Sequence, residues 1–231
     1  MSNGSLSPVS EPLAGQTGHT EAIRTCNKLE GLAAVNNAGT QLVVWPRALP
    51  ASLKAWLEAM EASRLPDLRV LAPATQVRNA IEPLLAKSKT PRGTMRDRLV
   101  ADVHNLVAQF ARISGADLVD IRLERVTDDA CWRFHRDCVE VRLLTTYLGP
   151  ATEWVQPIDA PRALAAQTRY DGPLERLATG HVAVFKGSLT GSQAGIVHRS
   201  PRIAGTGQTR LLLCLNVRSS ASPEPWIPQV R

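Results

Sequence analysis

The spacing of apolar residues changes near the middle of the chain, and this change limits the folds that the chain can adopt. Between residues 52 and 114, apolar residues recur three or four positions apart, as on one face of a helix. From Ala116 onward they alternate with polar residues, as in strands that bury one face. Helices that precede strands, instead of alternating with them, predict an α+β fold with an antiparallel sheet or barrel.

The first part of the chain predicts three helices. One begins near Ser52, the second runs from Thr75 to about Lys87 with a kink or an early end at Pro83, and the third runs from Thr94 to Ser114. Two short apolar runs, 39–47 and 67–73, are candidate strands between them. Later strands are predicted near residues 118–123, 139–145, 181–185, 195–198 and 210–217. The segment between residues 154 and 180 is a long insertion, typical of a lid or a binding loop.

A chain of 231 residues is long enough for one large domain, or for one domain with an extension. Residues 1–20 are rich in Ser, Gly and Pro and predict a disordered tail. Residues 21–115 are expected to form a helical N-terminal support region. Residues 116–220 are expected to form the strand-rich core, and residues 221–231 a C-terminal tail.

Composition restricts the cellular compartment and the classes of partner that can be predicted for the chain. The sequence has no apolar run of the roughly 18 residues that a membrane span needs and no secretory signal pattern, and its four cysteines are scattered. These features predict a cytoplasmic protein with reduced thiols and no membrane partner. The net charge is +6, and its one local concentration lies at residues 87–98. Because no aromatic residues are interleaved there, a nucleic-acid partner is not supported.

Three residues form a candidate metal site. His135 and Asp137 are two positions apart, and on an extended segment such residues share a face. Imidazole and carboxylate are two parts of the two-histidine, one-carboxylate triad that holds Fe(II) and leaves positions open. His198 follows a strand-like run about sixty residues later, which is enough chain to return beside the first pair. The sequence therefore predicts a metal site of His135, Asp137 and His198.

Two arginines are candidates for binding anions. Arg210 opens a strongly apolar strand, where a guanidinium group is costly to bury unless it meets an anion. Its planar group fits a carboxylate through two hydrogen bonds. An internal Asp or Glu partner, or an exposed strand end, would also explain this position. Arg202, four residues after His198, is a candidate for contacting substrate or a solvent-exposed loop residue.

The order His-x-Asp, His, Arg resembles that of the Fe(II)/2-oxoglutarate-dependent dioxygenases, in particular the prolyl-hydroxylase-like members. The resemblance covers about residues 130–218, through the segments CVEVRLLTTYLGPATEWV, GHVAVFKGS and HRSPRIAGTGQTRLLLCLN. It implies that residues 116–220 form a catalytic core with a double-stranded β-helix fold, which is related to the jelly roll. The N-terminal helices would pack against this core.

The same resemblance assigns roles to individual residues. His135, Asp137 and His198 would bind Fe(II), and the cosubstrate 2-oxoglutarate would be oxidised to succinate while an unknown substrate is hydroxylated or demethylated. Arg210 would pair with the far carboxylate of 2-oxoglutarate, helped by a hydroxyl group of Tyr147 or Thr145. One position departs from the family: Leu212 stands where a Ser or Thr often shares that carboxylate.

Over the whole chain, the segments LVVWPRALP, FHRDCVEVRLLTTYLGPATEWV and IVHRSPR resemble a bacterial family of unknown function, DUF1826. A link of this family to zinc homeostasis favours an alternative, a zinc-binding accessory protein without oxygenase activity. Its zinc ligands would be Cys131, His135, Cys138 and His198. However, on an extended strand Cys138 points away from the face of His135. A third possibility is a β-sandwich that binds a partner and has no catalytic activity.

Overall fold

The structure is a computed structural model that describes residues 22–191 and 195–228. The expected tail at 1–20, and residues 229–231 of the expected C-terminal tail, lie outside the described residues. The fold is α+β with a large, mostly antiparallel sheet, so the predicted class is confirmed. Among the described residues, no helix is both long and apolar enough to cross a membrane.

Seven strands form the large sheet, in which only β1 and β2 run parallel. In spatial order they are β1 (Ile23–Thr25), β2 (Leu42–Trp45), β8 (Val182–Lys186), β5 (Val141–Leu148), β10 (Arg210–Val217), β4 (Val119–Val126) and β3 (Leu68–Ala72). A smaller antiparallel sheet contains β7 (Glu175–Arg176), β6 (Glu153–Trp154) and β9 (His198–Arg199). The strand predicted near residues 195–198 overlaps β9 at His198, whereas β6 and β7 were not predicted, because two residues are too few to show a period of two.

The three predicted helices are present at nearly the expected places, as α1 (Ala51–Glu58), α2 (Val77–Lys87) and α3 (Thr94–Ser114). The short helix α4 (Ala160–Ala166) lies in the expected insertion and was not predicted as a helix. Helix α2 begins after a 3₁₀ turn at Ala74–Gln76 and continues past Pro83 to Lys87, so Pro83 does not end it. Helix α3 stops at Gly115, whose φ of +67° is the left-handed cap that glycine adopts without strain.

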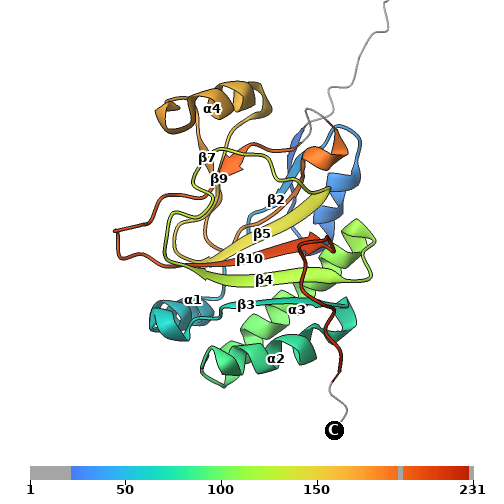
Figure 1. Cartoon of the computed structure of the whole chain (residues 1–231), viewed down its shortest axis with the longest axis vertical. Coiled ribbons are helices and arrows are strands. Elements are labelled where there is room, and N and C mark those ends of the chain that lie inside the picture. The colour runs from blue at the N-terminus through green and yellow to red at the C-terminus, as the bar shows by residue number, and fades with distance from the viewer. Residues whose placement is uncertain (1–21, 192–194, 229–231) are drawn as a thin grey trace, which may run out of the picture.

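Helices α1, α2 and α3 cover one face of the large sheet, as Figure 1 shows. Strand β10 explains how the sequence produces this arrangement. Its odd-numbered residues Leu211, Leu213 and Leu215 are buried in the main apolar core together with residues of α3 such as Leu99 and Phe110. Its even-numbered residues must therefore point to the opposite face of the sheet.

The opposite face is covered by the smaller sheet. Trp154 of β6 and Ile196, just before β9, pack against Leu144, Phe185 and Cys214 of the large sheet in a second apolar core. Two facing sheets with a core between them match the double-stranded β-helix predicted for the strand-rich part of the chain.

The N-terminal part of the chain is more than helical support. It supplies β1 and β2 to one edge of the large sheet and β3 to the other edge. The sequence predicted the last two of these strands, but their apolar pattern did not say that they join the sheet of the C-terminal part. The large sheet therefore contains strands from both sides of residue 115.

The insertion between residues 154 and 180 packs on the outer side of the smaller sheet. Ala160 and Ala163 of α4 contact Phe134, Val155 and Val197 in a third apolar cluster. Phe134 and Val197 alternate with His135 and His198 along their segments, so α4 lies on the face opposite to the two histidines. Helix α4, which lies beyond β9 in Figure 1, therefore supports the backbone that carries the histidines, and this is not the position of a lid over their side chains.

Candidate metal centre

Backbone pairing places His135 and His198 side by side. The two residues form an isolated antiparallel bridge in which each amide donates to the carbonyl of the other at 3.0 Å. Their ring centroids lie 4.5 Å apart. Asp137 follows two positions after His135, and the candidate ligand atoms of all three residues lie within 4.8 Å of one another. The structure therefore brings together the three predicted metal ligands.

Each imidazole ring is oriented by a carbonyl group two residues before it. Nδ1 of His135 lies 2.8 Å from the carbonyl oxygen of Arg133, and Nδ1 of His198 lies 3.1 Å from that of Ile196. Because a carbonyl oxygen only accepts hydrogen bonds, each Nδ1 carries a proton and donates. Metal-binding histidines are commonly held in this way, with the other ring nitrogen left for the metal.

The other ring nitrogens face the carboxylate of Asp137. Nε2 of His135 lies 3.4 Å from Oδ1, and Nε2 of His198 lies 3.4 Å from Oδ2. Burial raises the pKa of Asp137, but the contacts with His135 and His198 and the charge of Arg142 outweigh it, so that pKa lies well below its usual range. Asp137 in turn raises the pKa of His135. The three groups thus favour a cation between them, and this donor set fits Fe(II) or zinc.

Arg142 also contacts the carboxylate of Asp137, and it was not predicted from the sequence. Its Nη1 lies 2.6 Å from Oδ2 of Asp137, and its Nε donates to Oδ1 of Asn216 at 2.6 Å. The contact with Asp137 is an ion pair without hydrogen-bond geometry, since Oδ2 has no hydrogen-bond partner. The available signal was an arginine at an inward position of an otherwise apolar strand, the same signal that singled out Arg210.

Arg210 is buried beside this centre without a carboxylate partner. Its side chain is 1% exposed; Nε donates to the carbonyl oxygen of Pro150 and Nη1 to Oγ of Ser200, both at 2.7 Å. Nη2 is buried and has no hydrogen-bond partner among the described residues. Burial lowers the pKa of Arg210 to about 10, so the group is still a cation at neutral pH. The internal Asp or Glu partner considered from the sequence is not among the described residues.

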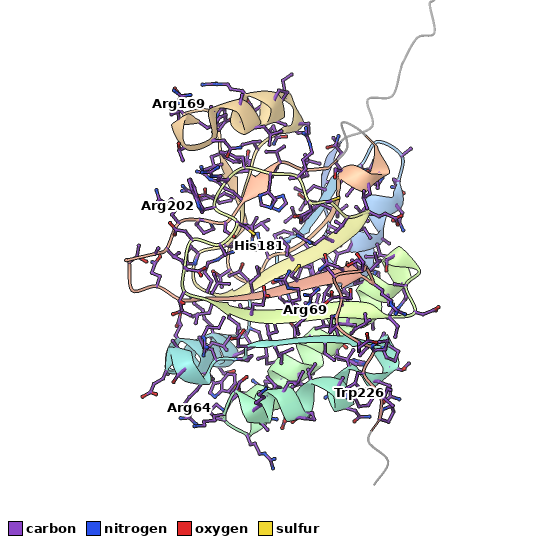
Figure 2. The ribbon with its side chains drawn as sticks, in the orientation of Figure 1. Arg64, Arg69, Arg169, His181, Arg202 and Trp226 are labelled. Atoms are coloured by element: carbon purple, nitrogen blue, oxygen red, sulfur yellow. The ribbon has the colours of Figure 1, made fainter. Side chains whose placement is uncertain are left out.

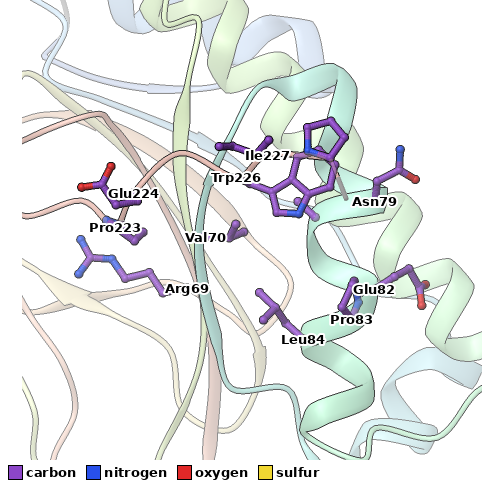
Figure 3. Close-up of a pocket in the computed structure, with 12 residues that line it drawn as sticks. Arg69, Val70, Asn79, Glu82, Pro83, Leu84, Pro223, Glu224, Trp226 and Ile227 are labelled. Carbon is purple, nitrogen blue, oxygen red and sulfur yellow. The ribbon is translucent and has the colours of Figure 1, made fainter. Parts of the chain in front are cut away.

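One cavity joins Arg210 to the metal ligands. Its volume is about 120 Å³, and its lining includes His135, His198 and Arg210, with apolar walls from Leu144 and Leu212. A larger cavity of about 770 Å³ lies elsewhere, between α2, β3 and residues 223–228 (Figure 3). Its lining contains Trp226 and Arg69 but no histidine or cysteine. We therefore place the functional site at the smaller cavity, where the reactive groups lie.

Tyr147 and Thr145 do not reach this cavity, so their predicted help to Arg210 is wrong. Tyr147 belongs to the core under the helices, and its hydroxyl group donates to Oδ2 of Asp102 on α3 at 2.5 Å. Thr145 pairs with Leu213 of β10, which points to the same helix-covered side. The sequence predicted a strand near residues 139–145 from alternating apolar positions, but this alternation alone does not identify the face that points toward the site.

Two other hydroxyl groups line the cavity in their place. They belong to Ser200 and Thr152. Ser200 lies two positions after His198, and this spacing could have identified it, since the same rule linked His135 to Asp137. Its hydroxyl group accepts a hydrogen bond from Arg210, whereas Leu212, at the position where a Ser or Thr was expected by resemblance, has no hydroxyl group.

Arg202 lies at the rim and is partly engaged. Its Nε donates to Oδ2 of Asp129 at 2.9 Å, and its guanidinium carbon lies 5.1 Å from the ring centroid of Trp132. The side chain is 70% exposed, and Figure 2 shows it near the outer edge of the molecule. A contact between Arg202 and substrate remains a prediction.

The cysteines do not join the histidines. All four cysteines are free, and Cys131 and Cys138 are exposed. Within residues 22–191 and 195–228, the only group of three or more candidate ligands is His135, Asp137 and His198. The zinc site expected from Cys131, His135, Cys138 and His198 is therefore not assembled.

Several solved structures are similar to this chain at low sequence identity. A Pseudomonas putida prolyl-4-hydroxylase is 17% identical with a TM-score of 0.43, over 83% of this chain and 95% of that chain. The dioxygenase for auxin oxidation 1 from Arabidopsis thaliana is 12% identical with a TM-score of 0.40, over 76% of each chain. The Kdo hydroxylase KdoO, a non-heme Fe(II) α-ketoglutarate-dependent dioxygenase, is 9% identical with a TM-score of 0.41, over 86% of this chain and 90% of that chain.

A search of curated proteins finds no match. Residues 26–216 match the family model described as "Protein of unknown function (DUF1826)", and the chain belongs to this family.

Proposed function

We propose that this protein is an Fe(II)/2-oxoglutarate-dependent oxygenase that hydroxylates or demethylates a substrate not yet known. The observation that carries the proposal is Arg210. It is a buried cation with a free Nη2 and no carboxylate partner among the described residues, in the same small cavity as His135 and His198. A buried charge without a partner is costly, so the cavity is suited to a ligand that brings a carboxylate group.

His135, Asp137 and His198 would hold the metal through one atom each. When bound, Fe(II) and 2-oxoglutarate supply the oxidation: O₂ is consumed, 2-oxoglutarate is decarboxylated to succinate and CO₂, and the second oxygen atom enters a C–H bond of the substrate. The carbonyl groups of Arg133 and Ile196 hold both rings in the tautomer that leaves Nε2 free.

Arg210 would bind and orient the far carboxylate of 2-oxoglutarate. Ser200 and the carbonyl group of Pro150 already fix the guanidinium group, so little side-chain freedom is lost on binding. Pro150 reaches Arg210 because Gly149, with φ +78°, turns the chain where a Cβ atom would lie 2.4 Å from the carbonyl oxygen of Thr209. Leu144 and Leu212 exclude water and strengthen the ion pair.

The test is anaerobic reconstitution of the full chain with Fe(II) and 2-oxoglutarate. We expect a weak visible charge-transfer band that requires both components, and succinate formation after O₂ is admitted. Arg210→Met should weaken 2-oxoglutarate binding by about 100-fold, as expected when one member of a buried charge pair is lost, while Fe(II) affinity is retained.

Arg169→Met is the matched control, because Arg169 is an exposed arginine outside the cavity. It should change neither affinity. Retained 2-oxoglutarate affinity in Arg210→Met would remove Arg210 from the proposed site. Tight zinc binding with no response to 2-oxoglutarate would instead favour the zinc-binding accessory protein, with His135, Asp137 and His198 as ligands.

A further inference from the structure

A second cavity opens on the exposed side of the metal centre. Its volume is about 330 Å³, and it is lined by Asp129, Cys131, Trp132, Arg133 and His135. Cys131 and His135 also line the cavity that contains Arg210. The side chain of His135 is 32% exposed, whereas those of Asp137 and His198 are 6% exposed. A substrate can therefore approach the metal centre from this side, while the Arg210 cavity holds the cosubstrate.

Arg133 and the metal ligand His135 line the same cavity. Phe134, between them in the sequence, points instead into the apolar cluster under α4. The carbonyl group of Arg133 also binds Nδ1 of His135, so the backbone of Arg133 is fixed relative to the metal ligand.

The free charge in this cavity is positive. Asp129 is the one carboxylate in its lining, and it already accepts hydrogen bonds from Arg202 and from the amides of Ile203 and Ala204. These bonds hold the pKa of Asp129 below its usual value. The guanidinium group of Arg133, in contrast, has no carboxylate within ion-pair distance and no side-chain hydrogen bond among the described residues.

Trp132 orients that free guanidinium group. The guanidinium carbons of Arg133 and Arg202 each lie 5.1 Å from the ring centroid of Trp132. A guanidinium group stacked on an aromatic ring keeps its N–H edge available for an acceptor. The guanidinium group of Arg202 donates to the carboxylate of Asp129, whereas that of Arg133 has no such acceptor in the described part of the chain.

We infer that the substrate is an anion, and that Arg133 binds its carboxylate or phosphate group beside the metal centre. This inference rests on the proposed function, because the oxygenase reaction makes the cavity beside His135 a substrate site. Because Arg133 and His135 line one cavity, a substrate whose anionic group lies a few bonds from the carbon that is oxidised would reach both residues. Trp132 is the positioning residue that holds Arg133 in place.

The test measures binding of three small probes to the full chain by saturation-transfer NMR: phenyl phosphate, benzoate and the neutral benzyl alcohol. The protein carries Arg210→Met, which removes the other unpaired arginine of the joined cavities as a competing anion site. We expect at least one anionic probe to bind about tenfold more tightly than benzyl alcohol. The tighter of the two anions identifies phosphate or carboxylate as the preferred group.

Variants at position 133 give the decisive comparison. Arg133→Gln should lower anion binding to the level of benzyl alcohol, and Arg133→Lys should retain part of it because the charge remains. Trp132→Leu should weaken anion binding without affecting benzyl alcohol to the same extent. In the Arg210-containing protein, Mn(II) at the triad should accelerate the ³¹P or ¹³C relaxation of the bound anion.

Arg169→Gln is the control, since it removes an exposed arginine from a surface outside both cavities. The inference is overturned if the anionic probes bind no better than benzyl alcohol, if Arg133→Gln binds them like its parent, or if Arg169→Gln loses as much. Failure of the oxygenase proposal is separate: it would show as no charge-transfer band and no succinate, whereas Arg133-dependent anion binding needs neither metal nor 2-oxoglutarate.

Discussion

The buried arginines of this protein differ in what they meet, and that difference identifies the site. Arg96 is 3% exposed and forms an ion pair with Glu82 together with hydrogen bonds to the carbonyl groups of Thr90 and Glu82. Arg210 is 1% exposed and meets only neutral partners. Arg96 therefore stabilises the folded chain, whereas the buried charge of Arg210 opposes folding.

This contrast predicts opposite stabilities for two matched variants. Burial lowers the pKa of Arg210 to about 10, so the charge disfavours folding below about pH 10, and the penalty is relieved as the pH rises through that value. At pH 7, Arg210→Met should leave the free energy of unfolding unchanged or raise it by up to about 2 kcal/mol. Arg96→Met should lower it by about 1–2 kcal/mol, because the carbonyl groups of Thr90 and Glu82 lose their hydrogen-bond donor.

Urea unfolding of the metal-free protein at pH 7 measures both changes. Adding 2-oxoglutarate and Mn(II) should stabilise the unsubstituted protein more than Arg210→Met. Equal losses of stability in the two arginine variants would mean that Arg210 is a structural residue.

At the scale of one element, β5 serves two layers through its alternating faces. Arg142 and Leu144 point toward the smaller sheet, where Arg142 contacts Asp137. Tyr147 points toward the helices and binds Asp102 of α3, which also receives two hydrogen bonds from Arg47. Burial, followed by the nearby charge of Asp102, raises the pKa of Tyr147, so its phenol group stays protonated and donates.

Removing one hydroxyl group on each side of the large sheet, at Tyr147 on the helix side and at Ser200 on the cavity side, distinguishes a role in stability from a role in cosubstrate binding. Tyr147→Phe should lower the free energy of unfolding by about 1–2 kcal/mol and leave 2-oxoglutarate affinity unchanged. Ser200→Ala should weaken 2-oxoglutarate binding by about threefold to tenfold with little loss of stability, since it frees Nη1 of Arg210. Calorimetric titration and urea unfolding distinguish the two outcomes, and weaker cosubstrate binding in Tyr147→Phe would restore its discarded role.

Besides the apolar contacts of α4 with Phe134, one polar side chain of the insertion binds the metal-ligand segment. Gln167 accepts a hydrogen bond from the amide of Phe134 and donates to the carbonyl group of the same residue, both at 3.0 Å. It does so from a backbone with φ +51°, which is unusual for a residue other than glycine. Because Phe134 lies next to His135, these two bonds fix the position of a metal ligand from the opposite face.

Removing the two hydrogen bonds of Gln167 should therefore weaken metal binding. Gln167→Ala is expected to weaken Mn(II) or Fe(II) affinity by about tenfold, as for other residues that orient metal ligands. The neighbouring exposed Thr168 provides the control variant, Thr168→Ala, which should bind metal normally. If Gln167→Ala lowers only the unfolding temperature and not the metal affinity, the insertion has no role in positioning the ligands.

At the scale of the whole molecule, the division of the chain at residue 115 does not separate two independent layers. Strands β2 and β3 from the N-terminal part flank the large sheet, and α3 covers the leucines of β10. Arg47 adds a link, because it binds both Asp102 and the carbonyl group of Gly180 just before β8. The catalytic core expected at 116–220 thus depends on the first part of the chain.

Expression of residues 116–220 alone tests this dependence. The fragment would expose the helix-covered face of its sheet and leave two edges unpaired, so we expect aggregation and no dispersed amide NMR spectrum. The span 22–228 is the control and should fold. A well-dispersed spectrum of the short fragment, with metal affinity equal to that of the full chain, would show that the core folds alone.

The sequence predicted the helices, the long strands and the three metal ligands because each depends on a local period or spacing. Residues 135–137 show this best, since the rule that residues two apart share a face places His135 with Asp137. The error at Tyr147 has a physical reason: both faces of its strand are buried, and a period of two does not show which buried face lies toward the site. Gln167 acts through a contact with a segment 33 residues away, which no local pattern contains. Arg142 had a local signal, an arginine in a mostly apolar strand, but its partner Asn216 lies on another strand.

The reciprocal backbone bond between His135 and His198 has a consequence for how the protein acquires its metal. Main-chain atoms alone make this bond, so it leaves Nε2 of both histidines for a metal, and ions that prefer these ligands compete for the same site. Nitrogen and oxygen ligands bind zinc more strongly than ferrous iron in the Irving–Williams series. If the site takes iron, as proposed, it would do so only where free zinc is scarcer than free iron, so the metals available to the protein would determine its metal content as much as its own ligands do.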